Sequence, residues 1–580
     1  MSRPRLERGP PTPGPAQFGE VVLGEVGSKG LRPTETLADP GTARAKLYSI
    51  AEAHSLSPTF PPEVMAEVAA LMKSPGIDDP DLVDRTELPF ITIDNEGSRD
   101  LDQAMHIERT PDGGFEVYYA LADASYYVRP GSALHDEAMK RGVTYYFPGF
   151  AIPMLPPELS EGIVSLNEGV DRRALMTVTK LDADGKVEST RFERAKIRSR
   201  AKLTYDGVQD YLDGNNPALG GHAHTETLHL LEALGKKRIH LADADKIVRI
   251  RREELRADID PQDPTRFVAR SRGRNVVEKY NEQISLLSNT EAGAFLDTPG
   301  NAPWVTPIYK VHPEPLESRV KDFARLSGAI AETWGLDPKV WAWSPKEEAL
   351  SDYLARLPID GPHGRMTKAI EQQAVMINSA SEFSAEPGKH HGIGAEPYAR
   401  LSSPMREMVG IYTHKETLEK LSGEPPSGWV KTNEASREEM VEIGAVTKKR
   451  QRDIERAADA LVLDTHLGSD LDLPEAERPT RVGTVLGLSA KKIYVRFDEP
   501  PFEVKLYVPN IEAQLGCELE LDDGRARLRG GAPDGMSDIA IGAEIALKTA
   551  RFDEEQGRYV LDVARVKGPE GAADGEQRRV

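Results

Sequence analysis

The side-chain periodicity of the chain changes twice, and this change limits the possible folds more than any single motif does. From Leu88 the segments PFITID, FEVYYALADASYYV and ALMTVTKLD are rich in β-branched and aromatic residues, and PDGG predicts a hairpin turn between HIER and FEVYYAL. From about residue 204 to residue 465 apolar residues recur at helical spacing instead. A strand-rich layer followed by many helices predicts one large α+β unit, which we place at residues 86–465.

A third pattern follows the acidic, proline-bounded segment DLDLPEAERPT. About five short strands with Gly-containing turns occupy the next stretch, and Lys491 and Lys492 lie among them. This pattern predicts a small all-β barrel of the oligonucleotide-binding (OB) class over residues 478–568. A barrel that serves only for packing is the alternative.

The two ends of the chain differ from these units. Residues 1–17 are rich in Pro, Arg and Gly, and we predict that they and residues 569–580 are disordered tails. Two helical patterns between residues 40 and 73 predict a small helical module over residues 18–85. These helices either form a module of the helix-turn-helix kind or support the domain that follows.

Composition places the protein in the cytoplasm as an expectation. No apolar stretch is long enough to span a membrane, and the proline-broken amino terminus has no apolar core of a secretory signal. The single cysteine, Cys517, excludes an internal disulfide and a cysteine-clustered zinc site. No obligate protein partner is evident.

The charge balance argues against a general nucleic-acid coat protein. The chain has 94 acidic and 74 basic residues, for a net charge of -20. An enzyme that binds RNA in a channel needs only local positive charge. Candidate basic clusters lie at 236–238, 249–252 and 448–452, with solvated helix faces as the alternative.

A group of carboxylates in ITIDNEGSRDLDQAM is the sharpest local feature. Asp94 ends a predicted strand, a Gly/Ser turn follows, and Asp100 and Asp102 are two residues apart, so their side chains point to one side of an extended segment. Three converging carboxylates favour Mg²⁺ or Mn²⁺, which could activate a water for phosphodiester hydrolysis. A solvated acidic turn is the alternative.

A second charged feature is LSSPMREM. Ser403 is predicted as a helix N-cap and Pro404 as the first helical residue, which places Arg406 in the first turn, where helix amides and a guanidinium favour a phosphate. An exposed helix arginine is the alternative. The adjacent His390 and His391, in a Gly-rich loop, are assigned a structural role.

ITIDNEGSRDLDQAM resembles the signature of the ribonuclease II (RNB) family, in which a strand ending in Thr-Ile-Asp precedes a short turn and Asp-hydrophobic-Asp-Asp. The resemblance continues through LADASYYV and HDEAMKRGVTYYFPGFAIPMLPPELSEGIVSLNEGVDRRALMTV, and returns at IYKVH, FSAEPGKHHGIGAEPYARLSSPMRE and RQRDIERAADALV. It covers roughly residues 86–465. The barrel that follows looks like the S-one-type RNA-binding domain of this family.

The resemblance implies a metal-dependent exoribonuclease that degrades single-stranded RNA processively from its 3′ end to nucleoside 5′-monophosphates. Mg²⁺ is the implied cofactor, with Mn²⁺ possible in its place, and single-stranded RNA is the implied partner. Residue by residue, it assigns catalysis to Asp100, Asp102 and Arg406; metal binding to Asp94, Asp100, Asp102 and Gln103; and RNA contacts to Tyr146, Tyr205, Glu282 and Glu455. Without the resemblance, Tyr146 would be assigned to strand packing and Glu455 to a solvated helix face.

The sequence departs from the family pattern in several places. Gln103 stands where the family has a fourth aspartate, Met408 replaces an aromatic residue, and Gly410 replaces an acidic one. Only about 85 residues precede the signature, too few for the two cold-shock barrels common in the family. An RNA-binding protein with impaired catalysis and a hydrolase of small phosphoesters are therefore the competing hypotheses.

Overall fold

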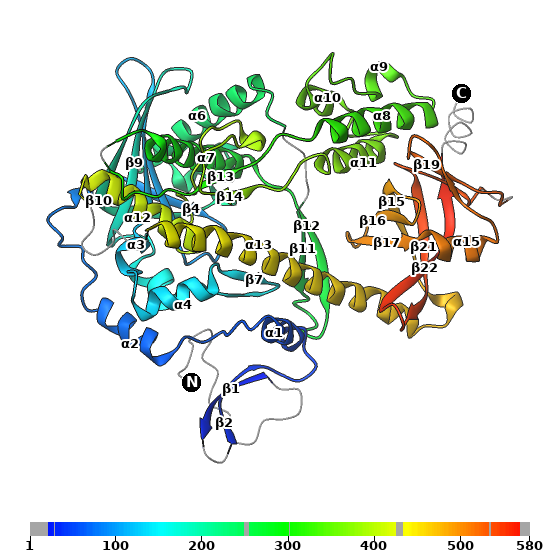
Figure 1. Cartoon of the computed structure of the whole chain (residues 1–580), viewed down its shortest axis with the longest axis horizontal. Helices are drawn as coiled ribbons and strands as arrows, with labels where there is room; N and C mark the ends of the chain where they lie inside the picture. Colours follow the sequence, from blue (N-terminus) through cyan, green and yellow to red (C-terminus); the bar gives the residue numbers. More distant parts are fainter. Residues whose placement is uncertain are drawn as a thin grey trace. The chain divides into compact units, whose positions relative to one another are not determined.

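The computed structural model describes residues 21–27, 30–248, 254–300, 302–424, 433–532 and 535–568 (Figure 1). The chain divides into two compact units. The first unit comprises Met1–Asp245, Arg274–Pro313 and Ser381–Arg456, and the second comprises Lys246–Gly273, Glu314–Ala380 and Ala457–Val580. The predicted tails at 1–17 and 569–580 and the basic cluster at 249–252 lie outside the described residues.

The first unit is built on a six-stranded sheet in the order β3-β10-β4-β5-β6-β9. The long strand β10 pairs antiparallel with β9 along its first part and parallel with β4 along its last part, so one strand joins the two ends of the sheet. The strands are β3 (Val83–Asp84), β4 (Phe90–Asp94), β5 (Gln103–Arg109), β6 (Phe115–Ala122), β9 (Asp171–Leu181) and β10 (Val187–Thr204). The predicted hairpin between HIER and FEVYYAL is confirmed as β5 and β6.

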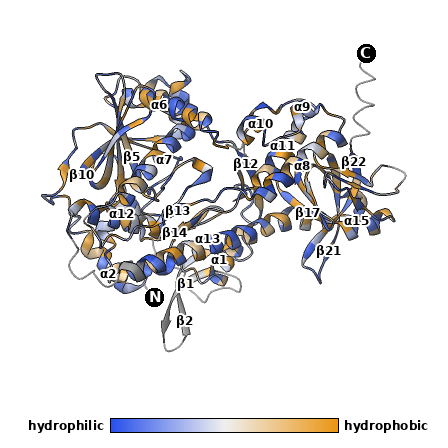
Figure 2. Ribbon diagram, turned by 45° about the horizontal axis from the view of Figure 1, so that its top comes forward, coloured by the Kyte–Doolittle hydropathy of each residue, from blue (hydrophilic) through white to orange (hydrophobic). Residues whose placement is uncertain are grey.

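Helices cover both faces of this sheet, which is why its central strands are buried on both sides. Along β6 alternate residues enter different cores: Phe115, Val117 and Tyr119 enter one, and Tyr118 and Ala120 the other. Helices α5 (Tyr205–Leu212), α6 (Thr225–Ala244) and α7 (Val276–Asp297) contribute to the first core, and α2 (Pro62–Leu71), α4 (Ala133–Arg141) and α12 (Met408–Ser422) to the second. Helix α6 carries both hydrophobic and hydrophilic residues in Figure 2, as a helix with one buried face requires.

Short elements complete the first unit. They are α1 (Ala43–Ala53), α3 (Ala124–Tyr127), the strand pairs β7 (Tyr145–Phe147) with β8 (Phe150–Ile152) and β13 (Tyr309–Val311) with β14 (Glu382–Ser384), and α13 (Asn433–Leu463), whose last residues belong to the second unit. The strand predicted over FEVYYALADASYYV holds as far as Ala122, and its last part, DASYYV, is wrong. Asp123 accepts a hydrogen bond from the Tyr126 amide and caps the short helix α3 instead.

The amino-terminal region is not wholly helical. An antiparallel pair, β1 (Val21–Gly27) with β2 (Gly30–Ala38), precedes the two predicted helices α1 and α2. Phe60, Val64 and Val68 of the α2 region are almost fully buried in the core that α4 and α12 share. Helix α2 therefore supports the sheet unit, which was one of the two alternatives.

In the region predicted to be a barrel, the second unit contains a five-stranded antiparallel sheet in the order β17-β16-β15-β21-β22. Three consecutive strands, a helix and two closing strands are consistent with the OB class. The elements are β15 (Thr480–Leu488), β16 (Lys492–Phe497), β17 (Glu503–Tyr507), α15 (Val508–Leu515), β18 (Glu520–Leu521), β19 (Arg527–Arg529), β20 (Asp538–Ala540), β21 (Glu544–Asp553) and β22 (Arg558–Lys567).

Two segments that the sequence grouped with residues 86–465 pack with this barrel. They are the hairpin of β11 (Glu254–Ile259) and β12 (Phe267–Arg272), and the helices α8 (Glu317–Thr333), α9 (Pro338–Trp341), α10 (Leu350–Arg356) and α11 (Gly364–Val375); α14 (Ser469–Leu471) joins them. Trp334 Nε1 donates to the Ile541 carbonyl at 2.9 Å, and Gln373 Nε2 donates to the Leu486 carbonyl at 2.7 Å. Side chains far apart in sequence thus decide this grouping.

Across the described ranges, every helix is too short or too polar to pass through a lipid bilayer.

Candidate active site

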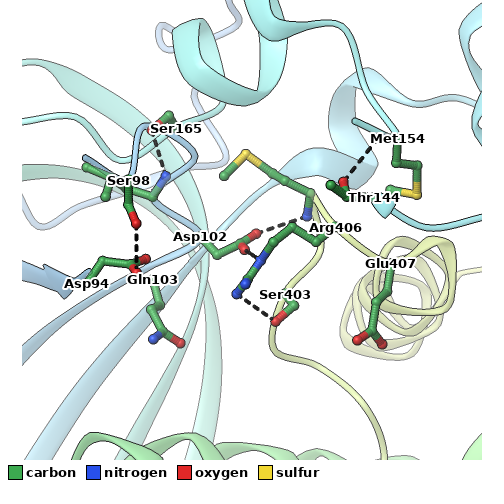
Figure 3. Close-up of polar contacts among 12 residues, drawn as sticks. Asp94, Ser98, Asp102, Gln103, Thr144, Met154, Ser165, Ser403, Arg406 and Glu407 are labelled. Atoms are coloured by element: carbon green, nitrogen blue, oxygen red, sulfur yellow. Dashed lines mark hydrogen bonds and ion pairs between the residues drawn. The ribbon is translucent and has the colours of Figure 1, made fainter. Parts of the chain in front are cut away.

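The aspartate loop, residues 94–102, connects the end of β4 to the start of β5. Asp94 ends β4 as predicted, and Ser98 Oγ donates to its carboxylate at 2.9 Å (Figure 3). Gly97 has a φ of +82°, a conformation that favours glycine and turns the loop back. Ser165 Oγ accepts from the Leu101 amide at 2.9 Å and donates to the Arg99 carbonyl at 2.7 Å, which holds the returning strand.

Asp102 lies at the centre of the site and is 1% exposed. One carboxylate oxygen accepts from the Met405 amide at 3.0 Å, and the other accepts from Arg406 Nε at 2.5 Å. Arg406 Nη2 donates to Ser403 Oγ at 3.1 Å. Figure 3 shows Asp102 and Arg406 pointing toward each other from segments about 300 residues apart in sequence, so tertiary packing creates this ion pair.

The carboxylates of the loop interact electrostatically. Burial, followed by the charge of Asp102, raises the pKa of Asp100 to about 6, while Arg406 acts in the opposite direction. Burial also raises the pKa of Asp102, and the charge of Asp94 adds to this effect. The negative charges therefore destabilise one another, and a cation between them would relieve that repulsion.

The prediction that Arg406 lies in the first turn of a helix is wrong. Glu407 is extended and forms a β-bridge with Val143, so α12 begins only at Met408. The Thr144 amide donates to the Arg406 carbonyl at 2.9 Å, which ties Arg406 to the segment before β7. Asp102, and not a helix N-terminus, orients the guanidinium.

Gly410 allows the start of α12 to approach the turn that carries Arg406. A Cβ at this position would lie 3.1 Å from Pro404 Cα and 3.2 Å from the Ser403 carbonyl oxygen. The backbone packs so closely here that it leaves little room for the acidic side chain that the family has at this position.

Gln103 follows Asp102 directly, so on an extended backbone the two side chains point in opposite directions, as Figure 3 shows. The Gln103 carbonyl oxygen accepts from the Tyr119 hydroxyl and from Ser285 Oγ, the latter at 3.3 Å. The Tyr119 and Ser285 hydroxyls are themselves 2.7 Å apart. Gln103 thus joins the sheet to α7.

Tyr146 lies next to this centre and is 50% exposed, whereas the adjacent Tyr145 is fully buried. Burial raises the pKa of Tyr146, and the charge of Arg406 lowers it, which reflects their proximity. Gln451 of α13 donates to the Tyr146 carbonyl at 3.5 Å and to the Glu455 carboxylate at 3.1 Å. The structure thus brings Glu455 to Tyr146 through one glutamine.

Tyr205 begins α5, and its hydroxyl accepts from Asn281 Nδ2 at 2.9 Å. Burial raises the pKa of Tyr205, and the charge of Asp94 raises it further. Glu282 pairs instead with Arg274 at 3.2 Å on the surface of α7. Asn281 is therefore the α7 residue that contacts Tyr205.

Sequence reasoning missed Asn281, Ser285 and Tyr119. Asn281 and Ser285 are four residues apart and thus share one face of α7. Two polar residues four positions apart in a largely apolar helix could have predicted that this face of the helix makes buried polar contacts.

The basic clusters have different surroundings. Lys236 pairs with Glu232 at 2.7 Å, and Arg238 donates to the Gly185 carbonyl, so these side chains are already engaged on α6. In the cluster at 448–452, Arg450 donates to the Tyr145 hydroxyl at 3.2 Å. This cluster lies beside the β7 strand that carries Tyr146.

The chemistry of Asp94, Asp100 and Asp102 fits a divalent cation, because carboxylate oxygens are the ligands that Mg²⁺ and Mn²⁺ prefer. Within the described part of the chain, however, no three His, Cys, Asp or Glu side chains are arranged to hold one ion. Both oxygens of Asp102 face protein donors. A ligand set would therefore need Asp102 or its neighbours to rearrange.

The fold and the site together define a class of protein: an α+β unit with an aspartate loop, a paired arginine and an exposed tyrosine, combined with an OB-type barrel. The RNB domain family model matches residues 82–421, and the chain belongs to this family. Nucleases of this family are in general metal-dependent.

Relatives and solved structures agree with this assignment. Ribonuclease R from Vibrio cholerae is 26% identical over 526 residues, covering 83% of this chain and 59% of the relative. Ribonuclease R from Escherichia coli is 26% identical over 569 residues, covering 94% and 66%, so the chain spans less than two thirds of these relatives. Exoribonuclease 2 from Edwardsiella piscicida is 31% identical over 357 residues, covering 59% and 51%.

Two solved structures share the fold. Mycoplasma genitalium RNase R in complex with ribose-methylated single-stranded RNA has a TM-score of 0.77 at 19% identity, covering 92% of this chain and 80% of that one. Yeast Ssd1, described as a pseudonuclease, has a TM-score of 0.63 at 15% identity, covering 86% and 59%.

Proposed function

We propose that the protein is a metal-dependent exoribonuclease that hydrolyses single-stranded RNA processively from its 3′ end, releases nucleoside 5′-monophosphates and acts in RNA turnover. The observation that carries this proposal is the meeting of the aspartate loop with Arg406 beside the exposed Tyr146. The names of the relatives, ribonuclease R and exoribonuclease 2, support it.

Asp94, Asp100 and Asp102 would hold the metal, for which Mg²⁺ is the first choice and Mn²⁺ the second. When bound, such an ion supplies an activated water and neutralises charge on the phosphodiester. Because the oxygen of Gln103 accepts from Tyr119 and Ser285, we assign the ligand charge to the three aspartates. The charge of these three aspartates would hold one metal ion, and the substrate phosphate would bring a second.

Arg406 would stabilise charge on the scissile phosphate. Its Nε and Nη2 groups are engaged by Asp102 and Ser403, and the guanidinium also interacts with the Tyr146 hydroxyl. Asp102 then sets both the position and the direction of the guanidinium.

Tyr146, Tyr205, Glu282 and Glu455 would contact the RNA. The exposed ring of Tyr146 offers a stacking surface that suits every base, in keeping with a base-tolerant enzyme. Glu455 can accept from a ribose 2′-hydroxyl, which would favour RNA over DNA. We assign the same preference to Tyr205 and Glu282.

The cytoplasm is the proposed place of action, supported by the single cysteine. Single-stranded RNA is the proposed partner, and the proposal needs no obligate protein partner.

The alternative is an RNA-binding protein with impaired catalysis. The uncharged Gln103 and the pseudonuclease among the structural neighbours favour it. The presence of Asp94, Asp100, Asp102 and Arg406 together favours the enzyme, since binding alone does not require them.

A 5′-labelled single-stranded RNA, incubated with Mg²⁺ beside an EDTA sample and an equal-length DNA, tests the proposal. We expect one short labelled product from RNA, none from DNA, and none with EDTA or with Asp102→Asn. Asp112→Asn, at an exposed aspartate paired with Lys180, is the matched control and should stay active. RNA that is bound but remains intact would support the binding protein, and Gln103→Asp would then be tested for restored activity.

A further inference from the structure

Three cationic side chains from separate segments gather beside the active site. Lys310 comes from β13, Arg400 from the segment before α12, and Lys448 from α13. We call these three residues the 310/400/448 cluster. Glu407 is the carboxylate that interacts with both Lys310 and Arg400.

Backbone contacts bring the three segments together. Lys310 lies directly opposite Phe383 in the β13–β14 pair, and the Lys310 amide donates to the Tyr398 carbonyl at 2.8 Å. Lys448 Nζ donates to the Ser381 carbonyl, immediately before β14. A Cβ at Gly444 would lie 2.4 Å from the Phe383 ring, so a glycine there lets α13 approach the strand pair.

The three cations of the cluster outnumber the carboxylates that interact with them, which are Glu407 and, at Lys448, Glu382. Arg400 donates to both oxygens of Glu407, with Nε at 3.2 Å and Nη2 at 2.8 Å. Lys310 Nζ lies 5.5 Å from the centre of the Phe383 ring and makes no hydrogen bond or ion pair with the described residues. Arg400 therefore uses the carboxylate, and Lys310 has none of its own.

The pKa of Lys310 agrees with this excess of positive charge. Burial, followed by the charge of Arg400, lowers the pKa of Lys310 to about 8, and Lys448 acts in the same direction. Holding like charges together is unfavourable unless an anion binds among them. Such a concentration of positive charge stands out in a chain of net charge -20.

The cluster is next to the proposed reaction centre. Glu407 follows Arg406 directly, and the charges of Arg400 and Arg406 interact. Further along the same helix as Lys448, Gln451 contacts the carbonyl of Tyr146. A strand whose 3′ end reaches Tyr146 and Arg406 would therefore have its preceding phosphates close to these cations.

We propose that the 310/400/448 cluster is a second phosphate-binding site, which holds a backbone phosphate of the RNA upstream of the phosphate contacted by Arg406. This inference rests on the proposed function and adds to it the place where the strand is gripped. Lysine and arginine bind phosphate through charge-assisted hydrogen bonds. The phosphate of a released nucleotide has similar chemistry, and the experiment separates the two sources.

RNA affinity measured in EDTA tests the site, because binding is then read without cleavage. The full chain is compared with Lys310→Met, which keeps the length of the side chain, and with Lys448→Met as an independent variant. Lys180→Met is the matched control, because Lys180 of the same unit already pairs with Glu188 at 2.9 Å and Asp112 at 3.4 Å. The ligands are oligoribonucleotides that each carry one uncharged methylphosphonate linkage, moved stepwise from the 3′ end.

We expect one upstream linkage at which the uncharged group weakens binding to the wild type about tenfold. Lys310→Met should bind unmodified RNA about tenfold more weakly and show no further loss at that linkage. The slope of log affinity against log salt should fall by about 0.7 in this variant. Lys180→Met should behave as the wild type.

Unchanged affinity and unchanged linkage penalties in both Lys310→Met and Lys448→Met would overturn the site. The site would also be overturned if the variants changed only the competition by adenosine 5′-monophosphate and left RNA affinity unchanged, because the cluster would then bind the released nucleotide. If either of these results is found while the wild type still degrades RNA in Mg²⁺, the second phosphate site is refuted and the proposed function is not. If the wild type neither binds nor degrades RNA, the proposed function fails as well.

Discussion

Replacing Arg406 with methionine is expected to destabilise the first unit as well as to abolish RNA hydrolysis. The Asp102 side chain is 2% exposed, and Arg406 is the cation that pairs with it. Methionine keeps most of the side-chain length but provides no donor. Asp102 would keep only the Met405 amide among its two side-chain partners.

The magnitude follows from the burial of the pair. Removing one partner of a buried ion pair costs about 3–5 kcal/mol, whereas exposed pairs contribute about 1 kcal/mol or less. Arg406 is 36% exposed, so solvent already screens part of its charge. We therefore expect the lower end of the range, about 3 kcal/mol.

The loss should depend on pH in a defined direction. Without Arg406, the pKa of folded Asp102 would rise further above its unfolded value, because burial already raises it. The folded state then binds more protons than the unfolded state, so the deficit shrinks as pH falls and grows as pH rises.

Hydrogen exchange of the Met405 and Thr144 amides is the appropriate measurement, because a chain of two units need not unfold in one step. Met405 donates to Asp102, and Thr144 donates to the Arg406 carbonyl. Arg406→Met should lose protection at both amides, and the double variant with Asp102→Asn should regain part of it, since no buried charge remains.

Arg191→Met is the control, because Arg191 is half exposed and pairs with Glu116 and Glu193 at the surface. It should change stability by about 1 kcal/mol or less. If Arg406→Met loses no more protection than Arg191→Met, or if the double variant is as unstable as the two single losses added together, Asp102 does not depend on Arg406 as argued.

Three further predictions concern other residues. Burial lowers the pKa of His414 from 6.5 to about 4, so only the unfolded state takes up a proton between these values. Melting temperature should therefore fall as pH drops from 6.5 to 4, and His414→Gln should remove about 3 kcal/mol of this loss; an unchanged pH profile would contradict it. Gly410→Asp should displace the turn at Pro404, cost about 1–3 kcal/mol and reduce RNA hydrolysis, and a fully active, equally stable variant would show that the contact is not tight. Tyr146→Ala should weaken binding of homopolymeric RNA by about 1–3 kcal/mol whatever the base, whereas Tyr146→Phe should not, as fluorescence anisotropy would show; equal affinities for Tyr146→Ala and wild type would exclude stacking.

Local patterns were sufficient for much of the fold. The alternation in HIER and FEVYYAL and the PDGG turn predicted the β5–β6 hairpin, and Asp94 ends β4 as expected. Short strands with glycine turns predicted the C-terminal barrel. These features depend on neighbours in sequence, so periodicity and turn residues describe them.

Long-range contacts explain the errors. Ser403-Pro404 is a plausible helix start on local rules, but the bridge between Val143 and Glu407 holds the backbone extended, so α12 begins at Met408. The hairpin of β11 and β12 interrupts a stretch predicted as helical. The grouping of residues 246–273 and 314–380 with the barrel depends on side chains such as Trp334, whose partner is more than 200 residues away.

By itself, the sequence determined the family, the α+β class and the identity of the aspartates, since these depend on residue types at short spacing. Only the tertiary structure decided how those residues are used. It paired Asp102 with Arg406, turned Gln103 toward Tyr119 and Ser285, and gathered Lys310 with Arg400 and Lys448. The physical reason is that burial and charge interactions depend on distance in space, and segments far apart in the chain meet only when the sheet and its helices pack.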